Sequence, residues 1–167
     1  MKNWNKTFIE IAEKFAEHST CIKRKVGAVL VKNLRILATG YNGTPTSFVN
    51  CDEVFHHNSS EANLKGILYH KKKDHEDLSS CEIISHHEFS ERYEIHAEQN
   101  CLSFAAKNGV STNKCTLYVT TAPCVHCAKI IIASGISRVV YKEVYKNAFG
   151  LQLLKEAGIQ VDCIENP

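Results

Sequence analysis

The sequence has no long apolar run and no excess of charge of one sign. No segment approaches the roughly 18 apolar residues that a membrane span needs, and charged side chains interrupt the first 18 positions, unlike a secretory signal peptide. The chain carries 20 basic and 18 acidic side chains, a formal charge of +2. A strong field that would steer it to DNA or RNA is therefore not expected. We expect a cytoplasmic protein with neither a membrane nor a nucleic-acid partner.

Internal repeats are also missing from the sequence. Its 167 residues and 44% hydrophobic content fit one compact domain spanning 1–167. Two short basic runs occur, at 23–25 and 71–73. A solvated surface is the simpler explanation for both runs, and a phosphate-facing role for the first is the alternative.

Cysteine and histidine, in contrast, are abundant. Without an export signal, and in a chain large enough to be stable without cross-links, thiols are more often buried, catalytic or metal-bound than paired in disulfides. The nine histidines favour metal binding. The eight cysteines are Cys21, Cys51, Cys81, Cys101, Cys115, Cys124, Cys127 and Cys163.

Hydrophobic periodicity predicts helices that alternate with short apolar strands. This order is typical of an α/β fold in which helices cover both faces of a mixed sheet. A turn signal at Lys32-Asn33 predicts that the first two strands form an antiparallel hairpin. We expect helices over about 2–18, 60–71, 95–107, 123–134 and 150–157, and strands over 26–31, 35–41, 116–120, 138–141 and 160–164.

The segment from about 46 to 92 is polar and shows no lasting period, yet it holds six of the nine histidines and two cysteines. A structureless loop of that length is improbable inside a small domain. We therefore expect an insertion with one short helix near 60–71. Lacking a core of its own, it would be held by a metal ion.

Two short motifs carry the chemistry. Cys124 and Cys127 are three residues apart at a predicted helix start opened by Pro123, so both sulfurs face one side and the helix dipole favours thiolate. With His96 they offer three ligands whose charge balances a divalent zinc ion, and the open fourth position is typical of catalytic zinc. Such a site acidifies a bound water. Glu98, two residues after His96, is suited to carry the proton.

Each motif alone is ambiguous. A Cys-x-x-Cys pair also occurs in redox motifs and structural zinc sites, and His-x-Glu alone carries little information. Their joint occurrence, with Pro123 before the cysteine pair, is the signature of zinc nucleobase deaminases. His126, inside the pair, is expected on the helix surface.

Further segments resemble the deoxycytidylate (dCMP) deaminases of the cytidine and deoxycytidylate deaminase family, most of all their phage and viral members. The resemblance spans nearly the whole chain, and Gly-Tyr-Asn-Gly at 40–43 separates these enzymes from cytidine, guanine and tRNA adenosine deaminases. It implies a cytidine-deaminase-like, three-layer α/β/α fold with a five-stranded mixed sheet, and the host cytoplasm for a viral protein. The matching segments are 26–28, 40–45, 96–100, 118–120, 123–129, 134–136 and 157–159.

The resemblance implies hydrolysis of dCMP to dUMP and ammonia, supplying dUMP for thymidylate synthesis. Hydroxide generated at the zinc attacks C4 of the ring, while Glu98 protonates N3 and assists the departure of ammonia. The Ala97 backbone is expected to bind the base and Asn42 the sugar. The other implied substrate contacts are Val26 and Tyr145, with Arg24 or Lys25 at the phosphate.

The resemblance also implies a second, structural zinc that anchors the insertion. Its ligands would be Cys21, Cys51, His86 (or His87) and Glu94, with Cys81 as a substitute. A closed four-ligand site suits a structural role. Free buried thiols and solvated histidines are the alternative, and His56, His57, His70 and His75 have no assigned role.

Many relatives of this kind are homohexamers that dCTP activates and dTTP inhibits, with Mg²⁺ accompanying the bound effector. The corresponding positions here are Gly43, Phe104 and Lys107, and this lysine replaces an arginine whose planar fork suits phosphate or nucleobase contacts. Alternative functions are a dual dCMP and dCTP deaminase, a nucleic-acid deaminase, or a non-catalytic nucleotide-binding protein. The near-neutral charge argues against a nucleic-acid deaminase, and the intact zinc motif argues against a non-catalytic protein.

Overall fold

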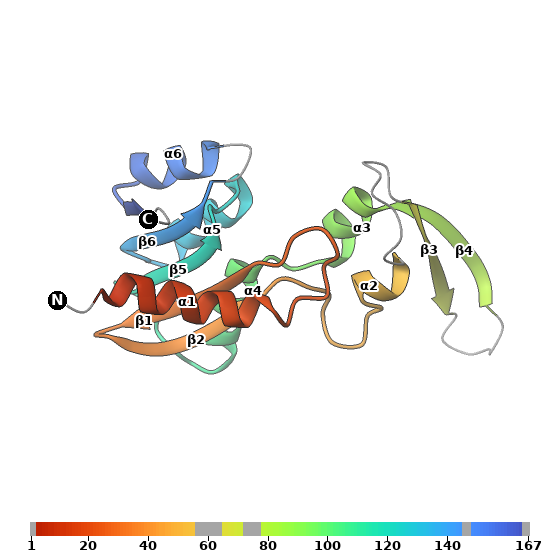
Figure 1. The fold of residues 1–167 in the computed structure, drawn as a ribbon, viewed down its shortest axis with the longest axis horizontal. Coiled ribbons are helices and arrows are strands. Elements are labelled where there is room, and N and C mark those ends of the chain that lie inside the picture. The colour runs from red at the N-terminus through yellow and green to blue at the C-terminus, as the bar shows by residue number, and fades with distance from the viewer. Residues whose placement is uncertain (1–2, 56–64, 72–77, 145–147, 165–167) are drawn as a thin grey trace. The chain divides into compact units, whose positions relative to one another are not determined.

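The computed structural model describes residues 3–55, 65–71, 78–144 and 148–164. The chain forms two compact units, which we describe separately (Figure 1). The sheet unit comprises Met1–Ser19, Lys25–Asn42 and His96–Pro167, and the hairpin unit comprises Thr20–Arg24 and Gly43–Ile95. No helix in these described ranges is long and apolar enough to cross a membrane.

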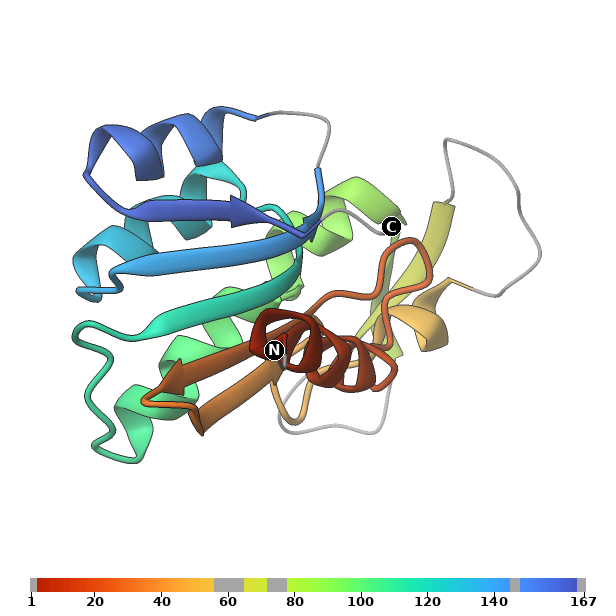
Figure 2. The same cartoon turned by 60° about the vertical axis from the view of Figure 1, so that its left-hand side comes forward.

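A five-stranded mixed sheet forms the centre of the sheet unit, in the order β2-β1-β5-β6-β7 (Figure 2). β1 (Gly27–Lys32) pairs antiparallel with β2 (Arg35–Tyr41) and with β5 (Thr116–Thr121). β6 (Arg138–Glu143) and β7 (Gln160–Cys163) extend the sheet in parallel from β5. The mixed sheet predicted from the sequence is confirmed.

The β1–β2 connection is a tight hairpin turn. Asn33 and Leu34 have φ values of 51° and 60°. Two consecutive left-handed residues match the twist of the flanking strands, as in type I′ turns. The turn signal at Lys32-Asn33 thus marks the right place in the chain.

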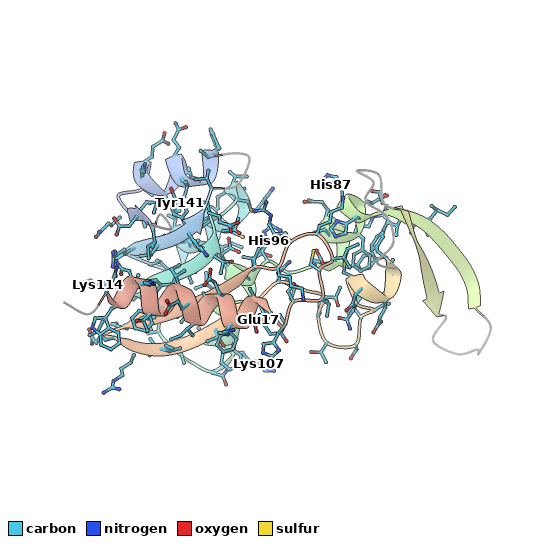
Figure 3. All side chains as sticks on the ribbon, in the orientation of Figure 1. Glu17, His87, His96, Lys107, Lys114 and Tyr141 are labelled. Carbon is cyan, nitrogen blue, oxygen red and sulfur yellow. The ribbon has the colours of Figure 1, made fainter. Side chains whose placement is uncertain are left out.

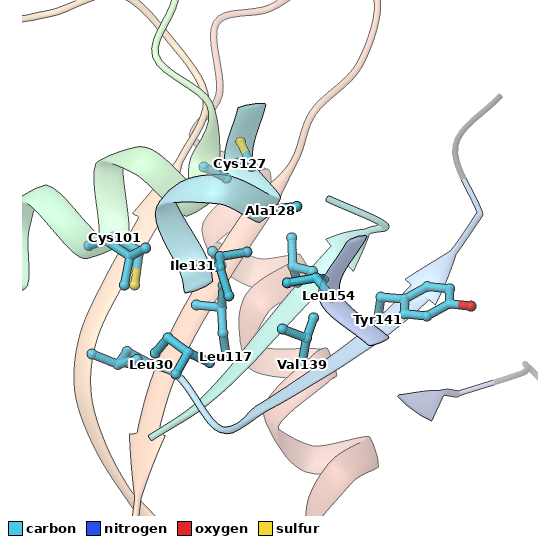
Figure 4. Close-up of a cluster of buried hydrophobic side chains, with 14 of the residues drawn as sticks. Leu30, Cys101, Leu117, Cys127, Ala128, Ile131, Val139, Tyr141 and Leu154 are labelled. Atoms are coloured by element: carbon cyan, nitrogen blue, oxygen red, sulfur yellow. The ribbon is translucent and has the colours of Figure 1, made fainter. Parts of the chain in front are cut away.

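Helices cover both faces of this sheet. α1 (Trp4–Ala16) packs on one face, where Phe8, Ile9 and Ala12 meet Val29 and Tyr118. α4 (Ala97–Lys107), α5 (Val125–Ala133) and α6 (Phe149–Glu156) cover the other face. Neighbouring strand residues point to opposite faces, so alternate residues of β1 pack beneath α1 and beneath the other three helices. Figure 4 shows the hydrophobic cluster beneath those three helices, which includes Leu30, Leu117, Ile131, Val139 and Leu154.

The hairpin unit is built differently from the prediction. Lys65–Lys71 forms strand β3, antiparallel to β4 (Leu78–Ser85), so the helix expected near 60–71 is wrong for 65–71. Residues 60–64 lie outside the described ranges. Gly66 is a poor helix former, and in the strand it pairs with Ile84 and lies so close to Val54 and Phe55 that an added Cβ would clash with them.

Two short helices complete the hairpin unit and give it a small core. α2 (Cys51–Val54) and α3 (His86–Tyr93) were not expected from the sequence. Phe55 and Phe89 meet edge to face, with ring centroids 5.4 Å apart, and Ile84 is fully buried beside them. The expectation that this segment lacks a core is therefore wrong.

Candidate metal centres

His96, Cys124 and Cys127 converge in the sheet unit. Nδ1 of His96 lies 3.5 Å from the Cys124 sulfur and 3.3 Å from the Cys127 sulfur. One ligand atom from each of the three residues lies within 4.8 Å of the others. Figure 3 labels His96 among the side chains of this unit. Two sulfurs and one imidazole nitrogen at this spacing fit a zinc ion with an open fourth position.

Two helix starts bring these donors together. His96 is the N-cap of α4, and its backbone N–H donates to Gln99 Oε1 at 3.0 Å. Cys124 is the N-cap of α5, and its sulfur accepts the Cys127 N–H at 3.5 Å. We expected Pro123 to open α5, but the helix begins at Val125 and Pro123 precedes the cap. The cysteine sulfur itself satisfies a helix-terminal N–H.

Gly40 holds α4 close to the sheet. A Cβ added at Gly40 would lie 2.5 Å from the Cys101 nitrogen and 2.6 Å from the Ala97 carbonyl oxygen. Strand β2 therefore touches the first turn of α4 backbone to backbone. The first glycine of the Gly-Tyr-Asn-Gly segment thus allows α4 to pack closely against the sheet. This position matters for the site because α4 carries Glu98 and follows His96 directly.

The Cys124 and Cys127 thiols shift each other's pKa in opposite directions. The Cys127 thiol donates to Cys124 and lowers the pKa of Cys124 to about 3, helped by His96. The same pairing raises the pKa of Cys127, with burial adding to the effect. A soft divalent cation would replace the proton of the Cys127 thiol and stabilise both thiolates.

Glu98 is buried beside these donors, with a relative exposure of 4%. Burial raises the pKa of its carboxyl, while the nearby His96 acts in the opposite direction. A carboxyl with a raised pKa is suited to take up and release a proton near neutral pH. Glu98 thus lies beside the three donors with a raised carboxyl pKa, which is compatible with the proton-carrying role expected from the sequence.

A second cluster lies in the hairpin unit. Cys21, Cys51 and His86 are all buried, and one ligand atom from each lies within 4.8 Å of the others. The Cys21 sulfur is 3.5 Å from His86 Nε2. Of the two histidines left open by the sequence, His86 joins this cluster, whereas His87 is exposed. The side chain of Cys81 lies outside the described part of the chain.

Glu94 supplies an unused buried oxygen near this cluster. Its Oε2 accepts a hydrogen bond from Ser90 Oγ at 2.7 Å, but its Oε1 is buried and has no hydrogen-bond partner among the described residues. Burial raises the pKa of this carboxyl, and the charge of Cys21 adds to the increase. Buried polar atoms are almost always paired, so an unpaired oxygen here is compatible with a fourth metal ligand beside Cys21, Cys51 and His86.

The predicted substrate residues Asn42 and Val26 are paired with each other. Asn42 Oδ1 accepts the Val26 N–H at 2.8 Å, and the Asn42 N–H donates to the Val26 carbonyl at 3.1 Å. Ala97 is fully buried at the start of α4. Tyr145 lies outside the described residues. Sequence reasoning missed Thr120, whose hydroxyl accepts the Gly27 N–H at 3.2 Å and fixes the start of β1.

The predicted phosphate and effector residues are divided between the two units. Lys25 Nζ donates to the Glu17 carbonyl at 3.3 Å, just beyond the end of α1, and Arg24 is exposed in the hairpin unit. Phe104 and Lys107 are both exposed, one turn apart on α4. Gly43 pairs with Ile95 through two backbone hydrogen bonds of 3.1 and 2.8 Å.

Comparison with known proteins defines the class. Residues 2–143 match the family model of the cytidine and deoxycytidylate deaminase zinc-binding region. The deoxycytidylate deaminases of Enterobacteria phages T2 and T4 are each 41% identical over 93% of this chain. The alignments cover 89% of the T2 protein and 86% of the T4 protein. The chain therefore belongs to the cytidine and deoxycytidylate deaminase family, an enzyme family with a zinc-binding region, as the resemblance predicted.

The solved structures agree with this assignment. The dCMP deaminase of cyanophage S-TIM5, in complex with dCMP and dUMP, superposes with a TM-score of 0.72 at 31% identity. The match covers 98% of this chain and 99% of that structure. The match thus spans nearly the whole length of both chains.

Proposed function

We propose that this chain deaminates dCMP hydrolytically, giving dUMP and ammonia, with one catalytic zinc ion held by His96, Cys124 and Cys127. The observation that carries the proposal is the convergence of these three donors beside the buried carboxyl of Glu98. The choice of dCMP rests on relatives named deoxycytidylate deaminases that match over most of their length.

The roles of the residues follow from their chemistry. Zinc bound by the three donors supplies a Lewis acid that makes water acidic enough to react near neutral pH. Glu98 accepts the proton that this water loses and delivers it to N3 of the cytosine ring. It then takes the proton of the new hydroxyl group at C4 and passes it to the leaving amino group as the C4–N4 bond breaks and the C4 carbonyl forms. Water provides the new oxygen at C4, and ammonia carries away the nitrogen.

Substrate positioning is assigned to residues at the edges of this centre. We propose that the Ala97 backbone binds the base and that Asn42 and Val26 position the sugar, with Tyr145 nearby. The Asn42–Val26 pairing supports a rigid sugar site. Arg24 or Lys25, both exposed, would meet the phosphate.

Absorbance measurements on dCMP, dCTP, CMP and cytidine test the proposal. We expect rapid loss of the cytosine absorbance with dCMP and slow loss with CMP and cytidine. Glu98→Gln serves as the inactive variant, and Glu10→Gln, at an exposed position of α1, as the matched active control. Equal rates with dCTP would instead support a dual dCMP and dCTP deaminase. Deamination of single-stranded DNA alone would overturn the proposal.

A second, structural zinc is proposed in the hairpin unit, held by Cys21, Cys51, His86 and Glu94. The buried, unpartnered Oε1 of Glu94 supports this ligand set. All four residues belong to one unit, so such a site would join the segment before β1 to the insertion without involving the catalytic donors.

We propose that the two units of each chain act as one deaminase domain and that six chains form a homohexamer. Regulation by nucleotides is proposed at Gly43, Phe104 and Lys107. The exposed Phe104 and Lys107 support a role at a subunit or effector contact. We expect a sigmoidal dependence of rate on dCMP that dCTP with Mg²⁺ makes hyperbolic and that dTTP opposes. Absence of any response to either nucleotide would contradict this part of the proposal.

A further inference from the structure

Gly150, the second residue of α6, lies against the loop that carries the first zinc-binding cysteine. It is buried, and a Cβ added there would lie 2.1 Å from the Pro123 carbonyl oxygen. The same Cβ would lie 2.9 and 3.0 Å from the carbonyl carbon and oxygen of Cys124. The atoms it would meet are backbone atoms, which cannot rotate away as a flexible side chain can.

The Pro123–Cys124 segment is fixed on both sides. The Ala122 N–H donates to the Glu143 carbonyl at 2.8 Å, and the Ala128 N–H donates to the Cys124 carbonyl at 2.9 Å. Pro123 itself is among the fully buried side chains. A push against this segment therefore moves either Cys124 or α6.

The helix on the other side of the contact is also held firmly. Leu154, on the same helix as Gly150, is fully buried in the cluster that contains Ile131 and Val139 (Figure 4). Leu151 adds to this packing with an exposure of only 7%. Two firmly held segments thus meet at a position where only a hydrogen atom fits between them.

We propose that Gly150 is a positioning residue for Cys124, setting where the Cys124 sulfur lies relative to His96 and Cys127. The Cβ of an alanine at this position would have to move from 2.1 Å to at least 3.4 Å from the Pro123 carbonyl oxygen, which is the distance of an ordinary contact. This is a displacement of about 1 Å. Zinc–ligand distances tolerate only about 0.2 Å. This inference rests on the proposed catalytic zinc site and extends it to a residue that is no ligand.

Zinc release to a chelator tests the proposal without measuring activity. The time course of zinc release is followed, and the kinetic phase assigned to the catalytic site is the one that disappears in Cys124→Ser. In Gly150→Ala we expect this phase to accelerate about 10- to 100-fold, as changes around metal ligands typically do. Cobalt substituted for zinc should also show shifted visible bands, because its spectrum reports ligand geometry.

Gly27→Ala is the matched control. A Cβ at Gly27 would lie 1.9 Å from the Ala12 carbonyl oxygen and 2.7 Å from the Ala16 nitrogen, so it clashes equally with backbone, but against α1. This variant should lose stability while keeping the wild-type release rate and cobalt spectrum. Equal release from Gly150→Ala and wild type, or equal acceleration in Gly27→Ala, would overturn the proposal.

A second pair of variants applies if Gly150→Ala does not fold. Leu154→Ala loosens α6, and Ile9→Ala loosens α1 by removing a side chain of similar size from the opposite face. Only Leu154→Ala should accelerate zinc release, and equal rates in the two variants would contradict the positioning role. If wild-type protein shows no phase that depends on Cys124, both the zinc site and the inference fail, whereas a normal phase unaffected by α6 overturns the inference alone.

Discussion

Glu98 has a buried carboxyl beside the donor atoms of His96, Cys124 and Cys127, which come from the starts of two helices. In Glu98→Gln the side chain keeps its shape but can no longer carry a proton. We expect kcat for dCMP to fall about 10²- to 10⁴-fold, the usual contribution of a general acid–base group. Steady-state kinetics with zinc analysis of the same samples checks this, because zinc content should remain at the wild-type level. Full activity in the variant would remove Glu98 from the mechanism.

Asn42 has a structural bond whose loss can be measured. Asn42→Ala leaves the Val26 N–H without its 2.8 Å acceptor, and Asn42 is only 8% exposed. An unsatisfied buried donor costs about 1–3 kcal/mol of unfolding free energy, and we expect KM for dCMP to rise as well. Asn42→Asp keeps an acceptor oxygen and should recover most of the stability in urea unfolding. Equal stability of wild type and the alanine variant would argue against this role.

Local spacing was enough to predict that three metal-binding types of side chain converge, but not which residues support them. His96, Cys124 and Cys127 lie at helix starts, where three residues of sequence decide which side chains share a face. Thr120 and Gly150 act through partners 93 residues and more than 20 residues away in sequence, respectively, and no short pattern marks such pairs. One missed feature did have a local signal: Ser85 caps α3 by accepting the Glu88 N–H at 3.2 Å.

Among the secondary-structure elements, α1 covers its face of the sheet largely through aromatic and aliphatic packing. Phe8 is 3% exposed, and its ring lies 4.9 Å from that of Tyr118. Phe8→Ala should lower the unfolding free energy by about 3–5 kcal/mol. Trp4→Ala, at a position 43% exposed, should cost much less although it removes a larger ring. Denaturant unfolding of both variants tests this order, and a reversed order would contradict the packing described here.

The hairpin unit depends on a metal ion if the proposed second site is correct. Cys51→Ala should reduce bound zinc from two ions to one per chain and leave the phase that depends on Cys124 intact. Cys163→Ala, at an exposed cysteine on β7, is the matched control and should retain both ions. Elemental analysis of purified protein gives the answer. One zinc ion per chain, unchanged in Cys51→Ala, would exclude the structural site.

Elements with strong periodicity were predicted well, and those that depend on partners were not. The strands of the sheet unit are short apolar runs between clear turns, and β2 has the predicted bounds. β3 was mistaken for a helix and β4 was missed because the pairing of these two strands is not visible in the sequence. On β4, Ile84 is buried opposite Gly66 while neighbouring Ile83 is 70% exposed, although both are isoleucines.

For the whole molecule, the proposed zinc ion at His96, Cys124 and Cys127 is what would make the chain a dCMP deaminase. The direct measurement is zinc titration into metal-free protein while the absorbance of dCMP is followed. We predict that activity returns as zinc binds, and that Cys124→Ser stays inactive at every zinc concentration. Full activity in protein shown to be free of metal, or in zinc-saturated Cys124→Ser, would contradict the account.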